Sequence, residues 1–318
     1  MAFNTLKALA CGLALTVTPA LADDHSDWTK SKFGPDDQAG ASNLMTSEKA
    51  LEAIALMKTG TVMSIGRVYQ KEMPLFGIRA FALRGTAGLA GGPVGENKVV
   101  WLDDFLATEI GQVGTQFDGL GHIGIGTKNG SLFYNGVTQQ EMVGSDGLKL
   151  HGIEHVKPIF TRGIVLDIVA VKGAPMDAGQ EVSVADIEKA LQMQNIAPPS
   201  AGDVVLFHTG WGRHWITDNK TFNSGAPGIG MEAAAWLIER EVVLVGADTW
   251  PVEVVPNPDS RVAFPVHQEL IPKNGIFIHE NIATERLIEA GVSEFAYIYS
   301  PVPIKGATGS PGAPLAAY

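Results

Sequence analysis

The sequence predicts a domain of the α/β or α+β class, because short apolar strand runs alternate with amphipathic helical segments. The runs at 163–171 and 203–208 are typical of buried strands, and 231–241 has helical spacing. After the N-terminal segment, no linker divides the chain and no internal repeat is visible. With 318 residues, 45% of them hydrophobic and 18% charged, a large core is expected. We predict one domain over residues 23–318.

The first 22 residues differ from the rest. Lys7 is their only charged side chain, an apolar stretch follows at 8–17, and small residues precede Asp23. This order is typical of a secretory signal peptide. The apolar run is well short of the ~20 residues that a membrane span needs, although an N-terminal anchor is the alternative. We predict that residues 1–22 are removed and that the protein is periplasmic or secreted.

The net charge and the cysteine content exclude some classes of binding partner and of metal ligand. Removing residues 1–22 takes one of the 23 basic residues and none of the 34 acidic ones, so the formal charge falls from −11 to −12. This acidity disfavours nucleic acid, and it disfavours a membrane surface once the signal is gone. The single Cys11 lies in the predicted signal, which excludes thiol nucleophiles and thiolate ligands from the mature chain. Any metal must be held by His, carboxylate or amide oxygen.

The first half of the domain contains fewer clear elements. Residues 23–45 are polar and turn-rich, so we expect an N-terminal arm. A helix is predicted over 46–58, with Thr46 or Ser47 as its cap. Alternation at 61–69 predicts a strand, glycines at 85–92 predict a flexible loop, and 99–102 begins the next ordered stretch.

The second half is richer in strands. A helix is expected over 182–194, with Ser183 as its cap and Asp186 three residues later. A second helix is expected over 231–241, and the tail at 306–314 is expected to be a loop. The strands are predicted at 163–171, 203–208, 242–247, 275–278 and 295–299, the last of the chain.

The most informative segment for chemistry is 111–134. Gln116, Asp118 and His122 supply three oxygen or nitrogen donors within seven residues, and glycines surround them. In an extended stretch these three side chains share one face, and small neighbours leave room for an ion and a substrate. The spacing alone fits a glycine-rich turn with a capping Asp equally well.

Residues 112–122 resemble the motif His-x-Gly-Thr-His-x-Asp-x-Pro-x-His of the kynurenine formamidase-like cyclase family, which includes metal-dependent formamidases and isatin hydrolases. The matching residues are Gly114, Thr115, Asp118 and His122. Gln112 and Gln116 stand where the family has His, and Leu120 where it has Pro. Further segments resemble the family in consistent order: 162–168, 202–211, 245–249, His267, Glu280 and the closing loop 301–311.

The resemblance implies a mixed, barrel-like sheet with surrounding helices, often called a swivelling β/β/α domain. It also implies one or two divalent ions, held by Asp118, His122, His267 and Glu280. Gln116 offers a carbonyl oxygen in place of imidazole, which shifts preference from zinc towards manganese. The family's further acid/base His is missing, and His279 or Tyr134 are expected to replace it. Assembly as a homodimer or homotetramer is implied as well.

The expected activity is hydrolysis of a small-molecule substrate, namely a formyl or cyclic amide, or a lactone or ester. A metal-bound water would attack the carbonyl in each case. A periplasmic protein that uses the metal to bind a small molecule without turnover is the alternative, and an inactive relative without metal is a third. Without the resemblance, His267 is read as a core residue, and the tryptophans at 101, 211, 215 and 250 as core or as an aromatic pocket.

Overall fold

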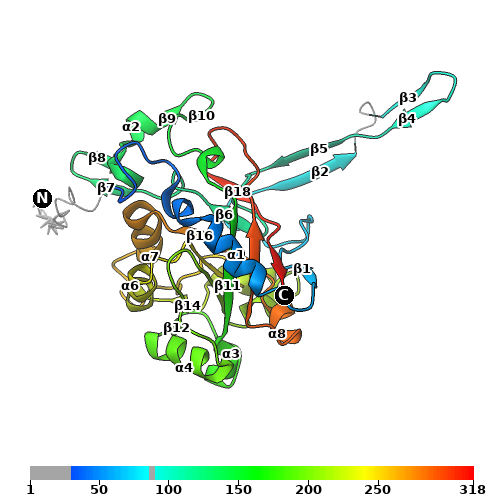
Figure 1. Ribbon diagram of the computed structural model, residues 1–318. Helices are drawn as coiled ribbons and strands as arrows, with labels where there is room; N and C mark the ends of the chain where they lie inside the picture. Colours follow the sequence, from blue (N-terminus) through cyan, green and yellow to red (C-terminus); the bar gives the residue numbers. More distant parts are fainter. Residues whose placement is uncertain (1–29, 86–89) are drawn as a thin grey trace, which may run out of the picture.

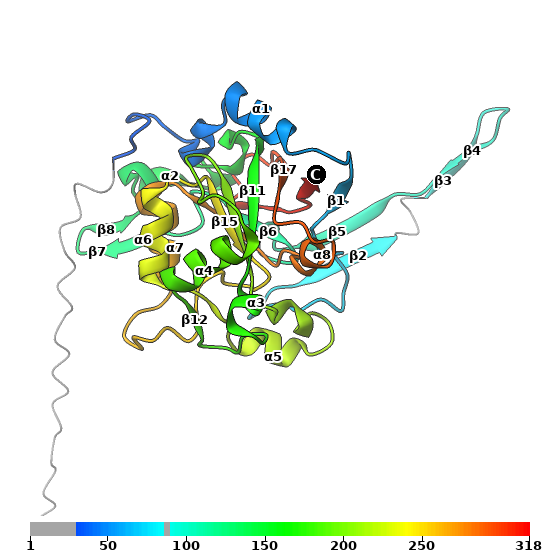
Figure 2. The same ribbon diagram turned by 60° about the horizontal axis from the view of Figure 1, so that its bottom comes forward.

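The computed structural model describes residues 30–85 and 90–318 and contains a curled, mixed sheet surrounded by helices (Figures 1 and 2). In order across the sheet, the nine strands are β1 (Val62–Ser64), β19 (Leu315–Ala317), β17 (Glu294–Tyr299), β11 (Ile159–Asp167), β13 (Val204–His208), β15 (Leu244–Ala247), β16 (Phe277–Glu280), β6 (Gln116–Asp118) and β18 (Gly309–Pro311). The predicted fold class, an α/β fold with a mixed, barrel-like sheet and surrounding helices, is confirmed.

The helices are short and separate most of the strands. The α-helices are α1 (Ser47–Ala55), α2 (Gln139–Met142), α3 (Ile168–Lys172), α4 (Val184–Gln194), α5 (Asn219–Ser224), α6 (Met231–Glu239), α7 (Pro265–Gln268) and α8 (Glu285–Glu289). The 3-10 helices are η1 (Gly40–Leu44), η2 (Tyr134–Gly136), η3 (Ile153–His155) and η4 (Trp211–His214), and η5 (Glu269–Lys273) is a π-helix.

The described residues also form five two-stranded sheets besides the main sheet. Their strands are β2 (Phe81–Gly85) with β5 (Asp104–Thr108), β3 (Gly91–Val94) with β4 (Val99–Trp101), β7 (Ile125–Thr127) with β8 (Gly130–Leu132), β9 (Val143–Gly144) with β10 (Gly147–Leu148), and β12 (Glu181–Val182) with β14 (Gly228–Ile229).

The centre of the main sheet is parallel. β11, β13, β15 and β16 run side by side in the same direction, and helices lie in the connections between them. These strands are buried on both faces, which explains their continuous apolar runs. Towards the other edge, β6 and β18 run antiparallel to their neighbours, so the chain segment around Asp118 lies beside β16.

Local sequence signals define the two best-predicted helices. α1 begins after Thr46, whose hydroxyl accepts a hydrogen bond from the amide of Lys49, and α4 begins after Ser183. Ser183 and Asp186 form the reciprocal capping box that the sequence predicts. α1 packs on β11 and β17, while the main core lies against α4 and α6.

Two predicted strand boundaries were wrong. The strand predicted at 163–171 ends at Asp167, whose side chain caps α3, because a short apolar run fits a buried helical turn as well as a strand. The strand predicted at 275–278 runs instead from Phe277 to Glu280. This shift brings His279 and Glu280 into the sheet.

Three predicted loop or strand regions also differ. The tail predicted as a loop at 306–314 contains β18, and β19 follows it, so the strand expected to be the last is not. Of the strand predicted at 61–69, only β1 forms. In the N-terminal arm, η1 contributes buried residues to the body of the protein, since backbone contacts to Gly275 hold it there.

Residues 81–85 and 90–108 project from the body as a long two-stranded ribbon, formed by β2 with β5 and then β3 with β4 (Figures 1 and 2). Part of the loop predicted at 85–92 belongs to this ribbon, and residues 86–89 lie outside the described residues. The predicted signal at 1–22 also lies outside them. Among the helices in the described ranges, none is long and apolar enough to cross a membrane.

A buried ion network ties α1 to the centre of the sheet. Asp203 is fully buried and pairs with Lys49 at 2.6 Å and with Arg162 at 2.9 Å. Removing one partner of a buried pair destabilises a protein by about 3–5 kcal/mol when it leaves an uncompensated charge. Lys49 and Arg162 keep Glu52 and Glu294 as partners, so we predict a smaller loss of about 1.5–3 kcal/mol for Asp203→Asn, measured by urea denaturation. Asp259→Asn, at an exposed pair, is the matched control and should change nothing measurable.

Candidate metal centre

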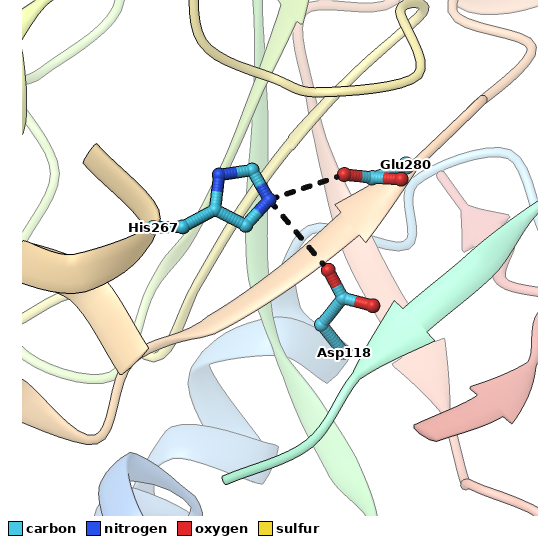
Figure 3. A group of neighbouring side chains, drawn as sticks. All are labelled: Asp118, His267 and Glu280. Atoms are coloured by element: carbon cyan, nitrogen blue, oxygen red, sulfur yellow. Dashed lines mark hydrogen bonds and ion pairs between the residues drawn. The ribbon is translucent and has the colours of Figure 1, made fainter. Parts of the chain in front are cut away.

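The pairing of β6 with β16 brings the acidic residues of the site together. Gln116 lies opposite Glu280, and Asp118 lies two residues further along the same strand. Because opposite residues and alternate residues share a face of a sheet, these three side chains point to the same side. α7 places His267 over that face (Figure 3).

Asp118, His267 and Glu280 form the centre of the site. Nε2 of His267 lies 3.3 Å from Oε1 of Glu280 and 3.8 Å from Oδ2 of Asp118 (Figure 3). One donor atom from each residue lies within 4.8 Å of the other two, and all three residues are buried. The sequence predicted all three as ligands, from segments separated by about 150 residues.

These three donors fit a divalent metal ion. Ligand atoms about 2.1 Å from a metal lie about 3.0–3.4 Å from one another in octahedral or tetrahedral geometry. The 3.3 Å between His267 and Glu280 lies in this range, and the 3.8 Å between His267 and Asp118 is slightly longer. Oδ2 of Asp118 is buried and accepts no hydrogen bond from any residue in the described ranges. An unpartnered buried carboxylate oxygen is unfavourable without a cation. An ion between the three side chains would satisfy it.

Glu253 orients His267 and was not predicted from the sequence. Its fully buried carboxylate accepts hydrogen bonds from Nδ1 of His267, at 2.5 Å, and from the backbone amides of Val266 and His267. With Nδ1 donating to Glu253, Nε2 is directed at Asp118 and Glu280. This carboxylate–histidine arrangement is typical of metal sites. An acid flanked by valines at 252–255 was the only signal in the sequence.

The electrostatics of the site also favour a cation. Burial raises the pKa of Glu280, and the nearby charge of Asp118 raises it further. Burial alone would lower the pKa of His267, but hydrogen bonds and charges of Glu253 and Glu280 raise it to about 10. A proton on His267 thus takes the place that a metal ion would fill, and binding the ion would release that proton.

Two glutamines stand behind the carboxylates. Nε2 of Gln112 donates to Oδ1 of Asp118 at 2.9 Å, and Nε2 of Gln116 donates to Glu280. Gln116, expected to be a ligand through its carbonyl oxygen, is therefore brought to the site but directs its amide nitrogen at Glu280. The carboxylates of Asp118 and Glu280 each keep one oxygen towards His267 and have the other bound by an amide.

His122 lies at the edge of the donor set. Its Nε2 is 3.8 Å from Oδ1 of Asp118, and its side chain is 21% exposed. It follows β6 in a turn closed by the backbone of Gly119, so it does not continue the extended face expected from its spacing. Burial lowers the pKa of His122, which leaves its imidazole neutral near pH 7. A neutral imidazole next to the ligands is suited to accept a proton.

A pocket of about 210 Å³ opens onto this site. Aromatic rings form one wall, where Phe76 stacks on Trp250 at 4.2 Å and Phe264 lies edge-on between Trp250 and His267. Of the four tryptophans considered for an aromatic pocket, Trp250 lines this one. Arg79 also lines the pocket and was not singled out from the sequence.

The structure does not bring His279 and Tyr134 to this site. His279 follows the alternation of β16 and points to the opposite face from Glu280, where Nδ1 bonds the hydroxyl of Tyr297 at 2.6 Å. Burial lowers its pKa to about 3. The hydroxyl of Tyr134 bonds Ser31 and Asp37 at 2.7 Å, and Tyr134 lines another pocket.

The fold and the site together define an α/β protein with a buried acid–histidine centre suited to a divalent metal. A family profile described as putative cyclase matches residues 26–254. The chain therefore belongs to this cyclase family, as the motif at 112–122 predicts.

Solved structures agree with this assignment. A crystal structure described as a novel cyclase has 30% sequence identity and a TM-score of 0.78, with 90% of this chain and 96% of that chain covered. Isatin hydrolase A from Ralstonia solanacearum has 21% identity and a TM-score of 0.62, with coverages of 86% and 97%. An isatin hydrolase bound to the product analogue thioisatinate has 17% identity and a TM-score of 0.59, with coverages of 86% and 98%. The two hydrolases share the fold. Comparison with curated proteins finds no match.

Proposed function

We propose that the protein is a metal-dependent hydrolase that opens a small cyclic or acyl amide, or a lactone or ester. The observation that carries this proposal is the unpartnered Oδ2 of Asp118, which faces His267 and Glu280 at the end of an aromatic pocket. Isatin hydrolases have the same fold, and their name says that they hydrolyse isatin, which is a cyclic amide. This supports a cyclic amide as one type of substrate.

The residues of the site have distinct tasks in this proposal. Asp118, His267 and Glu280 would hold one divalent ion, which when bound lowers the pKa of water and polarises a carbonyl. His122, neutral and beside Asp118, accepts the proton of the attacking water and returns it to the leaving group. The aromatic wall holds the substrate and reduces access of bulk water.

A single ion per chain, manganese or zinc, fits this donor set best. The carboxylate oxygens that a second ion would need are bound by the amide groups of Gln112 and Gln116. Two carboxylates and one imidazole form an oxygen-rich set, which favours manganese over zinc.

Elemental analysis and turnover test the proposal. Protein purified without chelators is expected to contain about one manganese or zinc ion per chain and to hydrolyse members of a panel of formanilides, cyclic imides and lactones. Activity should disappear with a chelator and return with the ion. Bound metal and bound panel members without any product would favour the alternative, a periplasmic binding protein without turnover. Absence of metal uptake would refute both.

Export is the second part of the proposal. The pattern at 1–22 supports removal of a signal peptide and a periplasmic or secreted protein. The N-terminal residue of the protein from its native host should then be Asp23. An intact N-terminus beginning at Met1 would contradict export by this route.

We also propose that the protein assembles as a homodimer or homotetramer through the projecting ribbon. Large apolar side chains on this ribbon are 45–87% exposed: Leu83, Val94, Val99, Val100, Trp101, Leu102, Phe105 and Leu106. An isolated two-stranded ribbon is marginally stable in water, and an apolar surface of this size is typical of an interface. At about 100 Å² for each side chain, the area approaches the ~800 Å² per partner of stable complexes.

Charges on the ribbon should therefore dissociate the assembly. We predict that Leu102→Asp combined with Phe105→Asp lowers the mass measured by light scattering from that of the oligomer to that of one chain. Met193→Asp, at an exposed apolar residue on α4, is the control and should leave the mass unchanged. A wild-type protein that is monomeric at micromolar concentration would contradict the proposal.

A further inference from the structure

Arg79 is the only lysine or arginine among the described residues that line the pocket. It lies between the aromatic wall and the metal-facing carboxylates, since its guanidinium is 5.6 Å from the ring of Phe76 and bonds to Gln112. A charged side chain in a mostly apolar pocket usually fixes the orientation of a ligand.

The charge of Arg79 has no partner of opposite sign in direct contact. Its guanidinium donates to two neutral oxygens, Oε1 of Gln112 at 3.1 Å and the carbonyl of Phe76 at 3.3 Å. Throughout residues 30–85 and 90–318, no carboxylate forms an ion pair with it. Arg67 and Arg162, which are similarly part-buried, each pair with a carboxylate. Arg79 therefore retains both charge and N–H donors for a ligand.

The bridge through Gln112 fixes where this charge lies. Arginine only donates hydrogen bonds, and an ionised carboxylate only accepts them. Gln112 must therefore turn Oε1 towards Arg79 and Nε2 towards Asp118, as observed. The guanidinium is held at a set position relative to the metal-facing carboxylate. A ligand bound to Arg79 is thereby placed relative to the site of hydrolysis.

The charge balance of the site leaves Arg79 available. A divalent ion would neutralise the charges of Asp118 and Glu280, and Glu253 lies behind His267, bound to its Nδ1. The positive charge that then faces the pocket belongs to Arg79. This arrangement favours an anionic ligand, because a planar guanidinium matches a carboxylate with two parallel hydrogen bonds.

The pocket dimensions indicate the rest of the ligand. Cavities of about 150 Å³ bind benzene, so about 210 Å³ accommodates one aromatic ring with short substituents. The ring would lie against Phe76, Trp250 and Phe264.

We propose that Arg79 determines specificity by binding a carboxylate on a single-ring aromatic substrate whose amide or ester carbonyl faces Asp118, His267 and Glu280. This inference rests on the proposed hydrolase function and adds the class of substrate to it. The anionic group is distinct from the carboxylate that hydrolysis itself produces.

A matched set of formamides tests the inference. The three positional isomers of formamidobenzoate carry a carboxylate on the same ring as neutral formanilide. For the best isomer, kcat/KM of the wild type should exceed that for formanilide by about 10–100-fold, the range for hydrogen bonds to charged groups. Arg79→Gln should remove this preference, so that the ratio of kcat/KM for the best isomer to that for formanilide falls by about 10–100-fold. Arg84→Gln, at an exposed residue of the ribbon, is the control and should retain it.

Two outcomes would overturn the inference. Equal losses on charged and neutral substrates in Arg79→Gln would show that Arg79 acts only through Gln112. A wild type without preference for any isomer would show that no anion is bound. If no formamide is turned over, calorimetry measures binding of benzenesulfonate, a weakly coordinating anion, and of neutral methyl phenyl sulfone. This tests the anion site at Arg79 separately from the proposed hydrolase activity. Benzenesulfonate binding tighter than that of the sulfone, and lost in Arg79→Gln, would support the anion site. Equal binding of the two compounds to the wild type would refute the anion site.

Discussion

Asp118→Ala is expected to lose bound metal and to lower kcat by at least about 10³-fold. Among the residues that the structure describes, Asp118 supplies the one buried carboxylate oxygen without a hydrogen bond, and removing it leaves two donors, His267 and Glu280. A metal that activates water and polarises a carbonyl contributes several kcal/mol to transition-state stabilisation, which corresponds to a loss of this size. Metal per chain, measured by elemental analysis, should fall from about one to below about 0.1.

The fold should survive this change. In the metal-free protein Asp118 lies near Glu280, and its charge raises the pKa of that residue, so its removal relieves a repulsion. We therefore expect a modest change in the free energy of unfolding. Asp118→Asn keeps an acceptor for Gln112 and provides a second variant with the same expected metal loss. Asp146→Ala, at an exposed turn, is the control. Full metal content in both Asp118 variants would show that the ion binds elsewhere.

Much of the fold could be predicted because its signals are local. The capping residues Thr46 and Ser183 and the apolar strands require only neighbouring residues, and the structure confirms them. The C-terminal strands escaped prediction because β18 and β19 are short and rich in glycine, proline and alanine, so pairing with distant strands alone defines them.

The residues of the candidate site could be predicted only where they belong to a recognisable motif or to a segment that resembles the family. Asp118 came from the segment at 112–122, while His267 and Glu280 came from the resemblance to the cyclase family, since nothing in their own neighbourhoods distinguishes a ligand from a core residue. His279 lies one residue beyond the strand expected at 275–278, so the prediction assigned it no face. The observed strand includes His279, and alternation directs it to the face opposite Glu280.

Other features of the site depend on contacts distant in sequence. Tyr134 is about 100 residues from its partners Ser31 and Asp37, so its distance from the metal centre could not be inferred. Gln112 and Gln116 looked like weakened ligands in the sequence. The structure shows instead that they donate to Asp118 and Glu280, a role that becomes visible only when the strands are paired.

Glu253→Gln is expected to weaken metal binding by about 10–100-fold with little change in fold, as for other residues that orient a ligating histidine. The carboxylate fixes Nδ1 of His267 as a donor, which leaves Nε2 free to bind the ion. Glutamine has the same shape but lacks the charge that makes the imidazole a stronger ligand, and its amide nitrogen can select the wrong tautomer.

The comparison of binding and stability distinguishes this role from a structural one. Metal affinity should be measured by titration calorimetry on chelated protein, and unfolding on the same samples without metal. Glu269→Gln, at a partly exposed residue of η5 paired with Lys273, is the matched control and should bind metal like the wild type. If Glu253→Gln loses stability but keeps its affinity, Glu253 holds the backbone of α7 rather than the ring of His267. The loss of stability would then come from the hydrogen bonds that Glu253 accepts from the backbone amides of Val266 and His267.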